Sequence, residues 1–283
     1  EAFRQGRTIY HVDCDQGEIN NRVLGSRALV ADLKPFLRAA LTEARAVALP
    51  ERAEWECEIA DLRSQWPDTA ELNDVPGINP NAFLHQLSAA SRQAAAFVVD
   101  VGQHQMWAAQ SMDLAAEQRF LTSGGMGAMG FALPAAIGAS FAAGNAPVTM
   151  VAGDGGFQLN LQELQTVVHN RLPLKLVILN NHCHGMVRQF QQSYFDERYQ
   201  STYWGYSAPD FVQVAQAYGI AAGRVTDPAE VPHALAELWA DPHAPYLLEV
   251  GIDTFANAYP KIAFGRPMTE MEPFAQPIAM EGT

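Results

Sequence analysis

An aspartate among glycines and a pair of asparagines stand at a spacing that suits a cation held together with phosphate. Asp154 lies within Gly153–Gly156, and Asn181 follows it by 27 residues. Glycines let a backbone approach an anion closely, and the N–H groups at the start of a helix can receive phosphate. One carboxylate, one amide oxygen and one backbone carbonyl form half of an octahedral Mg²⁺ shell, which phosphate oxygens and water can complete. The two segments together predict a magnesium and phosphate site.

Buried strands must bring these two segments together. The apolar runs Val148–Ala152 and Leu174–Leu179 each end directly before one of the segments, with one crossover between them. Because ligands of open α/β sheets sit at the carboxyl ends of the strands, we expect the site there, with a third segment after Val101. Further helices are predicted at residues 82–93, 128–143, 159–170, 209–218 and 229–240, and further strands at 95–101 and 246–250.

This alternation predicts an α/β fold, a six-stranded, mostly parallel sheet with helices on both faces, over residues 81–262. Before it, a strand at Thr8–Asp13 and a helix at Ala28–Ala44 resemble the last βα piece of another domain, which we assign to residues 1–45. Residues 46–80 are acidic and rich in proline, which is typical of a linker, with one helix near 51–66. Residues 263–283 form a C-terminal tail.

Composition excludes several classes of protein. The 283 residues include 18 Lys+Arg and 31 Asp+Glu, for a net charge of −13, which disfavours nucleic acid as a partner. Three scattered cysteines form no disulfide framework, so we expect a cytoplasmic protein. No apolar run is long enough to predict a membrane span. Because the chain begins at Glu1, almost directly before a strand, we expect it to be a piece of something longer.

Three motifs allow other interpretations. Gly125–Gly130 fits the G-x-G-x-x-G pattern of a nicotinamide-dependent dehydrogenase, but the strand before it is short and Asp154 suits the metal motif better. His182–His184 could bind zinc only if the turn were sharp, and no second ligand pair is evident. An isolated Gly-Asp-Gly is most often a solvated turn. For Met126 we predict a place in the core.

The motifs resemble those of a known family. Gly153–Gly155, followed after 24 residues by Asn180-Asn181, is similar to the thiamine-diphosphate motif of thiamine-dependent decarboxylases and carboligases. Three further segments resemble the large catalytic subunit of acetolactate (acetohydroxyacid) synthase: Asp100–Trp107, Thr122–Gly130 and Gly185–Gln189. The resemblance covers residues 81–262, and Thr8–Leu41 is similar to the end of that family's central, FAD-associated domain.

The resemblance implies a role for each matching residue. Asp154, the side chain of Asn181 and the carbonyl of Cys183 would bind Mg²⁺. Met129 would force the cofactor into a V shape, the carbonyl of Gly127 would accept from its 4′-amino group, Met186 would line the substrate side and Phe190 would face the second substrate. The remaining contacts to thiamine diphosphate would come from Gln103, His104, Gly153, Gly155, Gly156 and Gly185.

The resemblance also implies the reaction and its partners. The enzyme would decarboxylate pyruvate and transfer the hydroxyethyl unit to a second 2-keto acid. Phe190 replaces the family's usual tryptophan, and Lys261–Glu272 is unlike the usual ending, so a keto sugar of surface-polysaccharide synthesis is the alternative acceptor. The pyrimidine-binding domain, with its activating glutamate, would come from the missing N-terminal half or another chain. We further expect a homodimer or tetramer, with FAD bound through the missing central domain. If the isolated fragment is the true gene product, a purely structural or regulatory role is the alternative.

Overall fold

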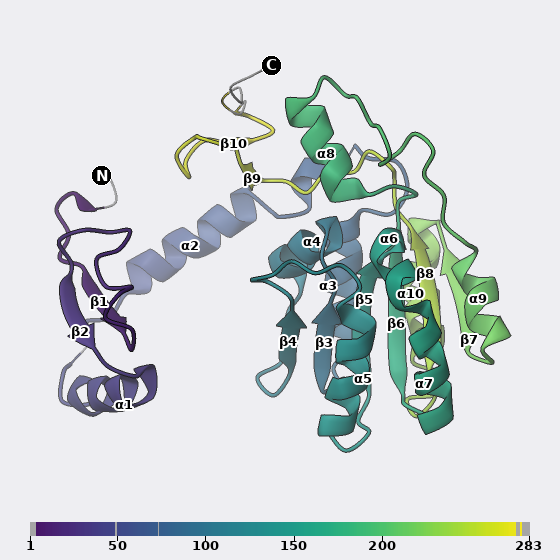
Figure 1. The fold of residues 1–283 in the computed structure, drawn as a ribbon, viewed down its shortest axis with the longest axis horizontal. Coiled ribbons are helices and arrows are strands. Elements are labelled where there is room, and N and C mark those ends of the chain that lie inside the picture. Colours follow the sequence, from purple (N-terminus) through teal and green to yellow (C-terminus); the bar gives the residue numbers. More distant parts are fainter. Residues whose placement is uncertain (1–3, 49, 73, 276–277, 279–283) are drawn as a thin grey trace. The chain divides into compact units, whose positions relative to one another are not determined.

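The computed structural model describes residues 4–48, 50–72, 74–275 and 278 (Figure 1). The chain divides into two compact units, Glu1–Leu62 and Arg63–Thr283. The division falls inside the segment that we interpret as a linker, residues 46–80. Each unit is described by itself below.

The first unit contains two parallel strands and the helix that follows them. β1 (Tyr10–Asp13) pairs with β2 (Arg27–Val30), and α1 (Leu33–Ala44) comes next. The sequence pattern extended the helix back to Ala28, which is wrong, because the residues before Asp32 are paired in β2. Asp32 ends the extended stretch and caps the helix by accepting a hydrogen bond from the Lys34 N–H at 2.8 Å. α2 (Ala53–Gln65) begins in this unit and coincides with the helix expected near 51–66.

The second unit is built on a six-stranded sheet in the order β4-β3-β5-β6-β8-β7. Every neighbouring pair is parallel, so the α/β fold predicted from the sequence is confirmed and no antiparallel strand interrupts this sheet. β7 was not anticipated, because it lies at an edge and its burial is only partial. The strands are β3 (Ala96–Val99), β4 (Arg119–Thr122), β5 (Val148–Gly153), β6 (Leu174–Asn180), β7 (Ala221–Val225) and β8 (Tyr246–Gly251).

Helices cover both faces of this sheet (Figure 1). One core lies under α3 (Pro80–Ala90), α4 (Gln103–Ser111) and α10 (Val231–Leu238), and the other under α5 (Ala132–Ala142), α7 (Leu164–Asn170) and α9 (Phe211–Ala217). Continuous apolar strands between two helical layers are typical of buried parallel sheets. The remaining elements are η2 (Ala70–Leu72), α6 (Asp154–Phe157), η3 (Gln158–Glu163), α8 (Gly185–Tyr194), η4 (Pro228–Glu230), and the antiparallel pair β9 (Lys261–Ile262) and β10 (Met271–Glu272).

One helix was not predicted from the sequence pattern, and two predicted helices have different boundaries. α4 was not predicted from periodicity, since its mixture of glutamine, histidine and tryptophan has no clear apolar stripe. The helix predicted at 128–143 begins only at Ala132, because Gly127 and Gly130 adopt left-handed backbone angles. The helix predicted at 159–170 is a succession of α6, η3 and α7 that starts at Asp154. No helix among the described residues has the length and apolarity needed to cross a bilayer.

The centre of the sheet contains a row of fully buried side chains. Leu176 on β6 lies in register between Met150 on β5 and Leu247 on β8, and all three are 0% exposed. Contacts in such a row are made on both sides of the side chain, so that little relaxation is possible after truncation.

We therefore expect Leu176→Ala to lower the free energy of unfolding by about 3 kcal/mol, within the usual range for a buried leucine. Leu114→Ala is the matched control, because Leu114 belongs to the same unit and is 40% exposed. Urea unfolding followed by circular dichroism measures both variants. Equal midpoints for the two would contradict the central position of Leu176.

Candidate active site

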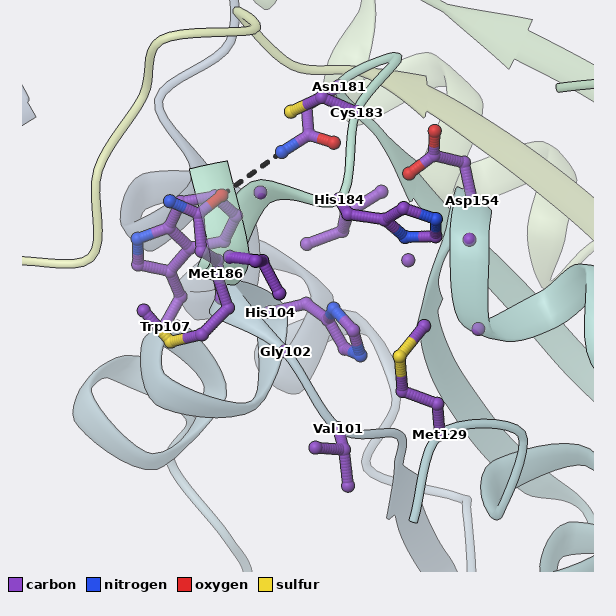
Figure 2. Close-up of a pocket in the computed structure, with 17 residues that line it drawn as sticks. Val101, Gly102, His104, Trp107, Met129, Asp154, Asn181, Cys183, His184 and Met186 are labelled. Carbon is purple, nitrogen blue, oxygen red and sulfur yellow. Dashed lines mark hydrogen bonds between the residues drawn. The ribbon is translucent and has the colours of Figure 1, made fainter. Parts of the chain in front are cut away.

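Most of the predicted site residues, all but Gly127 and Phe190, meet in one pocket at the carboxyl ends of β3, β5 and β6 (Figure 2). Gln103 and His104 begin α4 after β3, Asp154 begins α6 after β5, and Asn181 follows β6. β5 lies between β3 and β6, which brings the three segments together. The pocket is lined by Val101, Gly102, Gln103, His104, Trp107, Met129, Gly153, Asp154, Gly155, Gly156, Leu179, Asn181, Cys183, His184, Gly185, Met186 and Val187.

Asp154 is a buried carboxylate with few partners. It is 2% exposed, and its Oδ2 accepts a hydrogen bond from the Tyr206 hydroxyl at 2.8 Å. Within the part of the chain that the structure describes, no basic side chain forms an ion pair with it. Burial raises the pKa of Asp154 to about 6, although the Tyr206 hydroxyl and the Gly155 N–H oppose the shift. A buried carboxylate without a cation is suited to binding one.

Asn181 is oriented by a chain of neutral amides. Its Nδ2 donates to Oε1 of Gln103 at 3.1 Å, so its own oxygen remains available to a cation (Figure 2). Gln103 in turn donates from Nε2 to Oε1 of Gln189 and to the carbonyl of Ala256, both at 2.9 Å. Both hydrogens of the Gln103 side-chain amide are therefore engaged in hydrogen bonds. The predicted contact of Gln103 with a diphosphate would require one of these two hydrogen bonds to be lost.

Gly185 permits the close contact between these amides and α8. A Cβ on Gly185 would collide with the Gln103 side-chain oxygen and lie 2.6 Å from Nδ2 of Asn181. A residue with a side chain would thus displace the group that sets the orientation of Asn181. This explains physically why the segment after Asn181 needs a glycine there.

His104 provides an unsatisfied ring nitrogen at the edge of the pocket. The side chain is 6% exposed, and its Nε2 has no hydrogen-bond partner among the described residues. Burial lowers the pKa of His104 to about 4, so the ring is neutral at physiological pH. Buried polar atoms are almost always paired, and a neutral imidazole with its proton on Nε2 would donate to a phosphate oxygen.

The glycines around Asp154 lie against neighbouring side chains. A Cβ on Gly153 would lie 3.0 Å from the His104 ring, and one on Gly155 would lie 2.6 Å from that of His184. At Gly156 the position is occupied by the Asp100 carboxylate at 2.5 Å. The backbone of this run can therefore reach a ligand only because these positions lack side chains.

Cys183 does not have the character of a zinc ligand. Its thiol is buried and donates to the Thr254 carbonyl at 3.6 Å, and burial raises the pKa of the thiol to about 12. Zinc requires the thiolate. Among the residues that the structure describes, no three histidine, cysteine or carboxylate side chains are grouped to hold a metal ion. The carbonyl of Cys183 as a magnesium ligand stays a prediction.

The segment 126–129 is partly at the pocket and partly in solvent. Met129 lines the pocket and is 41% exposed. Gly127 is not among the lining residues, and its left-handed backbone (φ +68°) forms the turn before Met129. Met126 is 88% exposed, so its predicted place in the core is wrong. It lies in an exposed turn before α5 rather than on the buried face of that helix.

α8 carries the residues expected on the substrate side. Met186 lies in the first turn of α8 and lines the pocket. Phe190 lies one turn further along, outside the lining residues and 39% exposed. Its ring packs against those of Tyr194 at 4.3 Å and Phe195 at 6.0 Å between centroids. The role of Phe190 toward a second substrate therefore stays a prediction.

Two contributors were missed by sequence reasoning. Tyr206 bonds Asp154 from a distant loop, and no spacing pattern signals such a contact. Glu249 on β8 is buried and accepts from Nδ2 of Asn180 at 2.8 Å, while Oδ1 of Asn180 accepts the N–H of His182 at 3.0 Å. An acidic residue inside an otherwise apolar strand was the available signal for Glu249.

The arrangement has the features of a site for a divalent cation and a diphosphate: a buried unpaired carboxylate, an oriented amide oxygen, glycine backbone and a free imidazole. Residues 100–250 match the family model "Thiamine pyrophosphate enzyme, C-terminal TPP binding domain". The chain therefore belongs to the thiamine pyrophosphate (thiamine diphosphate) enzyme family. Helix α5 opens beyond Gly125–Gly130, which also disfavours the dehydrogenase interpretation of that glycine motif.

The chain is further similar to large subunits of acetolactate synthase, as its motifs predicted. It is 38% identical over 274 residues to the isozyme 2 large subunit of Escherichia coli (strain K12), covering 95% of this chain and 48% of that protein. The large subunit of Cyanidium caldarium is 34% identical over 275 residues, covering 96% and 46%. A probable large subunit of Methanocaldococcus jannaschii is 36% identical over 285 residues, covering 99% and 47%. The chain thus spans about half the length of these relatives.

The burial of Asp154 predicts a pH-dependent cost to the ligand-free protein. Folding raises the pKa of the Asp154 carboxyl from 3.8 to about 6. The protonated carboxyl therefore stabilises the folded state at a pH below 3.8, and this stabilisation is lost as the pH rises through about 6. Asp154→Asn should therefore raise the free energy of unfolding by about 2–3 kcal/mol at pH 8 and by little at pH 4.

Thermal or urea unfolding without added cation or cofactor measures this difference. Asp74→Asn serves as the control, because Asp74 is an exposed carboxylate. If Asp154→Asn were no more stable at pH 8 than the parent chain, burial of the ionised Asp154 carboxylate would not destabilise the folded state.

Proposed function

We propose that this chain forms the thiamine-diphosphate and Mg²⁺ site of an acetolactate synthase-like carboligase. The observation that supports the proposal most strongly is the meeting of the Asp154 carboxylate with the free oxygen of Asn181 in one pocket. Each of these oxygens is a ligand that Mg²⁺ prefers. The match to the thiamine pyrophosphate family and the similarity to acetolactate synthase subunits support the same assignment.

In this proposal the chain's own groups hold the metal and the diphosphate. Asp154, Asn181 and the carbonyl of Cys183 bind Mg²⁺, and phosphate oxygens complete its shell. The unpartnered Nε2 of His104 and the N–H groups of Gly155 and Gly156 donate to the diphosphate. The desolvation cost at Asp154 is offset when the cation binds.

The apolar side of the pocket positions the reactive part of the cofactor and keeps water away from it. Thiamine diphosphate supplies the acidic carbon and the electron sink needed to decarboxylate a 2-keto acid. Met129 would support the cofactor, the carbonyl of Gly127 would accept from its amino group, and Met186 would lie on the substrate side. A closed apolar wall would strengthen electrostatic interactions inside the site.

The substrates and partners follow from the relatives. Their names indicate acetolactate synthesis, so the donor proposed here is pyruvate and the first acceptor a second 2-keto acid. A keto-sugar acceptor is the second candidate, favoured by Phe190 and by the ending Lys261–Glu272. The full assembly would be a cytoplasmic homodimer or tetramer, with a pyrimidine-binding domain outside this chain and FAD held by the central domain.

Asp154→Ala should abolish Mg²⁺-dependent binding of thiamine diphosphate. The carboxylate is the only anionic protein ligand proposed for a cation that also holds two phosphate oxygens. Isothermal titration calorimetry of the full chain with cofactor and Mg²⁺ tests this, with Asp74→Ala as the control at an exposed carboxylate of the same unit. Unchanged affinity in Asp154→Ala would remove the metal assignment.

Phe190→Trp should raise the preference for 2-ketobutyrate over pyruvate as acceptor and leave donor decarboxylation nearly unchanged. Contact with one additional apolar group changes discrimination by about 1–3 kcal/mol, roughly 10–200-fold. A competition assay on the full assembly, with products separated by chromatography, measures the ratio. An unaltered ratio would mean that residue 190 does not face the acceptor.

A further inference from the structure

A loop that follows α8, residues 199–206, reaches the ends of two strands at once. We call it the connecting loop. At its end, the hydroxyl of Tyr206 donates to Oδ2 of Asp154 at 2.8 Å and accepts from Nε2 of Gln158 at 3.3 Å. Asp154 follows β5, so this hydrogen bond connects the connecting loop to the segment after β5 that carries the proposed carboxylate ligand.

The connecting loop is also hydrogen-bonded next to the turn Asn181–Cys183, which follows β6. The carbonyl of Thr202 accepts the backbone N–H of His184 at 2.9 Å, directly beyond the Asn181–Cys183 turn. The Thr202 hydroxyl donates to Oε1 of Gln191 at 2.5 Å, and Nε2 of Gln191 donates to the carbonyl of Gln200 at 3.1 Å. These bonds fix the loop on α8 as well as on the turn that carries the proposed ligands.

A contact between two aromatic rings also joins the connecting loop to the segment after β6. The His184 and Tyr206 rings meet edge to face, with 4.8 Å between centroids and an interplanar angle of 74°. The His184 ring also lies against Gly155 and borders the pocket. The Tyr206 ring is therefore held from the side of β6 while its hydroxyl bonds the residue that follows β5.

We propose that Tyr206 is a positioning residue, which orients the Asp154 carboxylate toward the divalent cation. The inference rests on the proposed magnesium site. The last torsion of an aspartate is broad, so a carboxylate without a fixed partner would rotate away from the position that the metal shell requires. The bond from the Tyr206 hydroxyl to Oδ2 restricts this rotation, together with the Gly155 N–H.

The chemistry of metal sites gives the size of the effect. Carboxylates that bind a metal are usually hydrogen-bonded by a neighbour, and removing that neighbour costs about 10–100-fold in metal affinity. Tyr206→Phe removes the hydroxyl and keeps the ring contact with His184. It should therefore weaken cation binding at least tenfold, without changing the number of cations bound.

The test measures Mn²⁺ binding to the full chain with saturating thiamine diphosphate, by electron paramagnetic resonance of the free ion. Tyr203→Phe is the matched control, since Tyr203 lies on the same loop and its ring packs against Phe255 rather than on Asp154. Near-ultraviolet circular dichroism and the thermal midpoint without ligand show whether each variant keeps its tertiary structure.

The proposal predicts weaker binding in Tyr206→Phe at an unchanged stoichiometry, with Tyr203→Phe equal to the parent chain. If Tyr206→Phe bound Mn²⁺ as tightly as the parent, the positioning role would be refuted while the magnesium site stood. A loss of stoichiometry or of tertiary structure in Tyr206→Phe would assign the hydroxyl to folding and overturn the proposal. If the parent chain and Asp154→Ala bound Mn²⁺ equally, the proposed function itself would fail.

Discussion

The burial of one carboxylate without a cation is the constraint on which the site depends. Asp154 lies at the end of β5 and is almost fully enclosed. Asp100, at the end of β3, is equally buried, but it accepts the N–H groups of Val101 and Gly130 and so holds the glycine turn against the sheet. The two aspartates therefore differ in what satisfies them: backbone for Asp100, and a distant tyrosine for Asp154. Burial raises the pKa of both carboxyls, and Asp154 is the one of the two that lines the pocket.

The parallel sheet converts this constraint into a site. Three adjacent strands end at the same edge, and each delivers one kind of group: an imidazole after β3, a carboxylate after β5 and an amide after β6. His104 and Asp154 lie in the first turns of α4 and α6, and α8 begins four residues after Asn181, so helix N-termini with their backbone N–H groups accompany all three. The order of the strands thus brings the three groups to one edge of the sheet.

The sequence was sufficient for what is local. Apolar runs of five to seven residues revealed the central strands, and the glycine–aspartate and asparagine motifs revealed the site, because both signals lie within short segments. β2, β7 and α4 were missed, since an exposed strand, a weak edge strand and a polar helix have no distinctive period. Met126 was misplaced for a related reason: an apolar residue type does not show that a turn holds it in solvent. The Tyr206 contact spans 52 positions, and no local pattern could reveal it.

The other charged groups near Asp154 are paired with one another rather than with it, among the described residues. Glu249 is buried near Asp154 and its charge contributes to the raised pKa of Asp154, after the larger effect of burial. Yet Glu249 is already satisfied, by Nδ2 of Asn180 at 2.8 Å and by the Arg224 guanidinium at 2.9 Å. Arg224 also forms an ion pair with Asp210 at 2.9 Å, so the guanidinium interacts with two carboxylates, neither of which lines the pocket. Neutral amides orient Asn181, and no basic side chain among the described residues forms an ion pair with Asp154. In the proposed function, the charge of that carboxylate is therefore available to the metal cation.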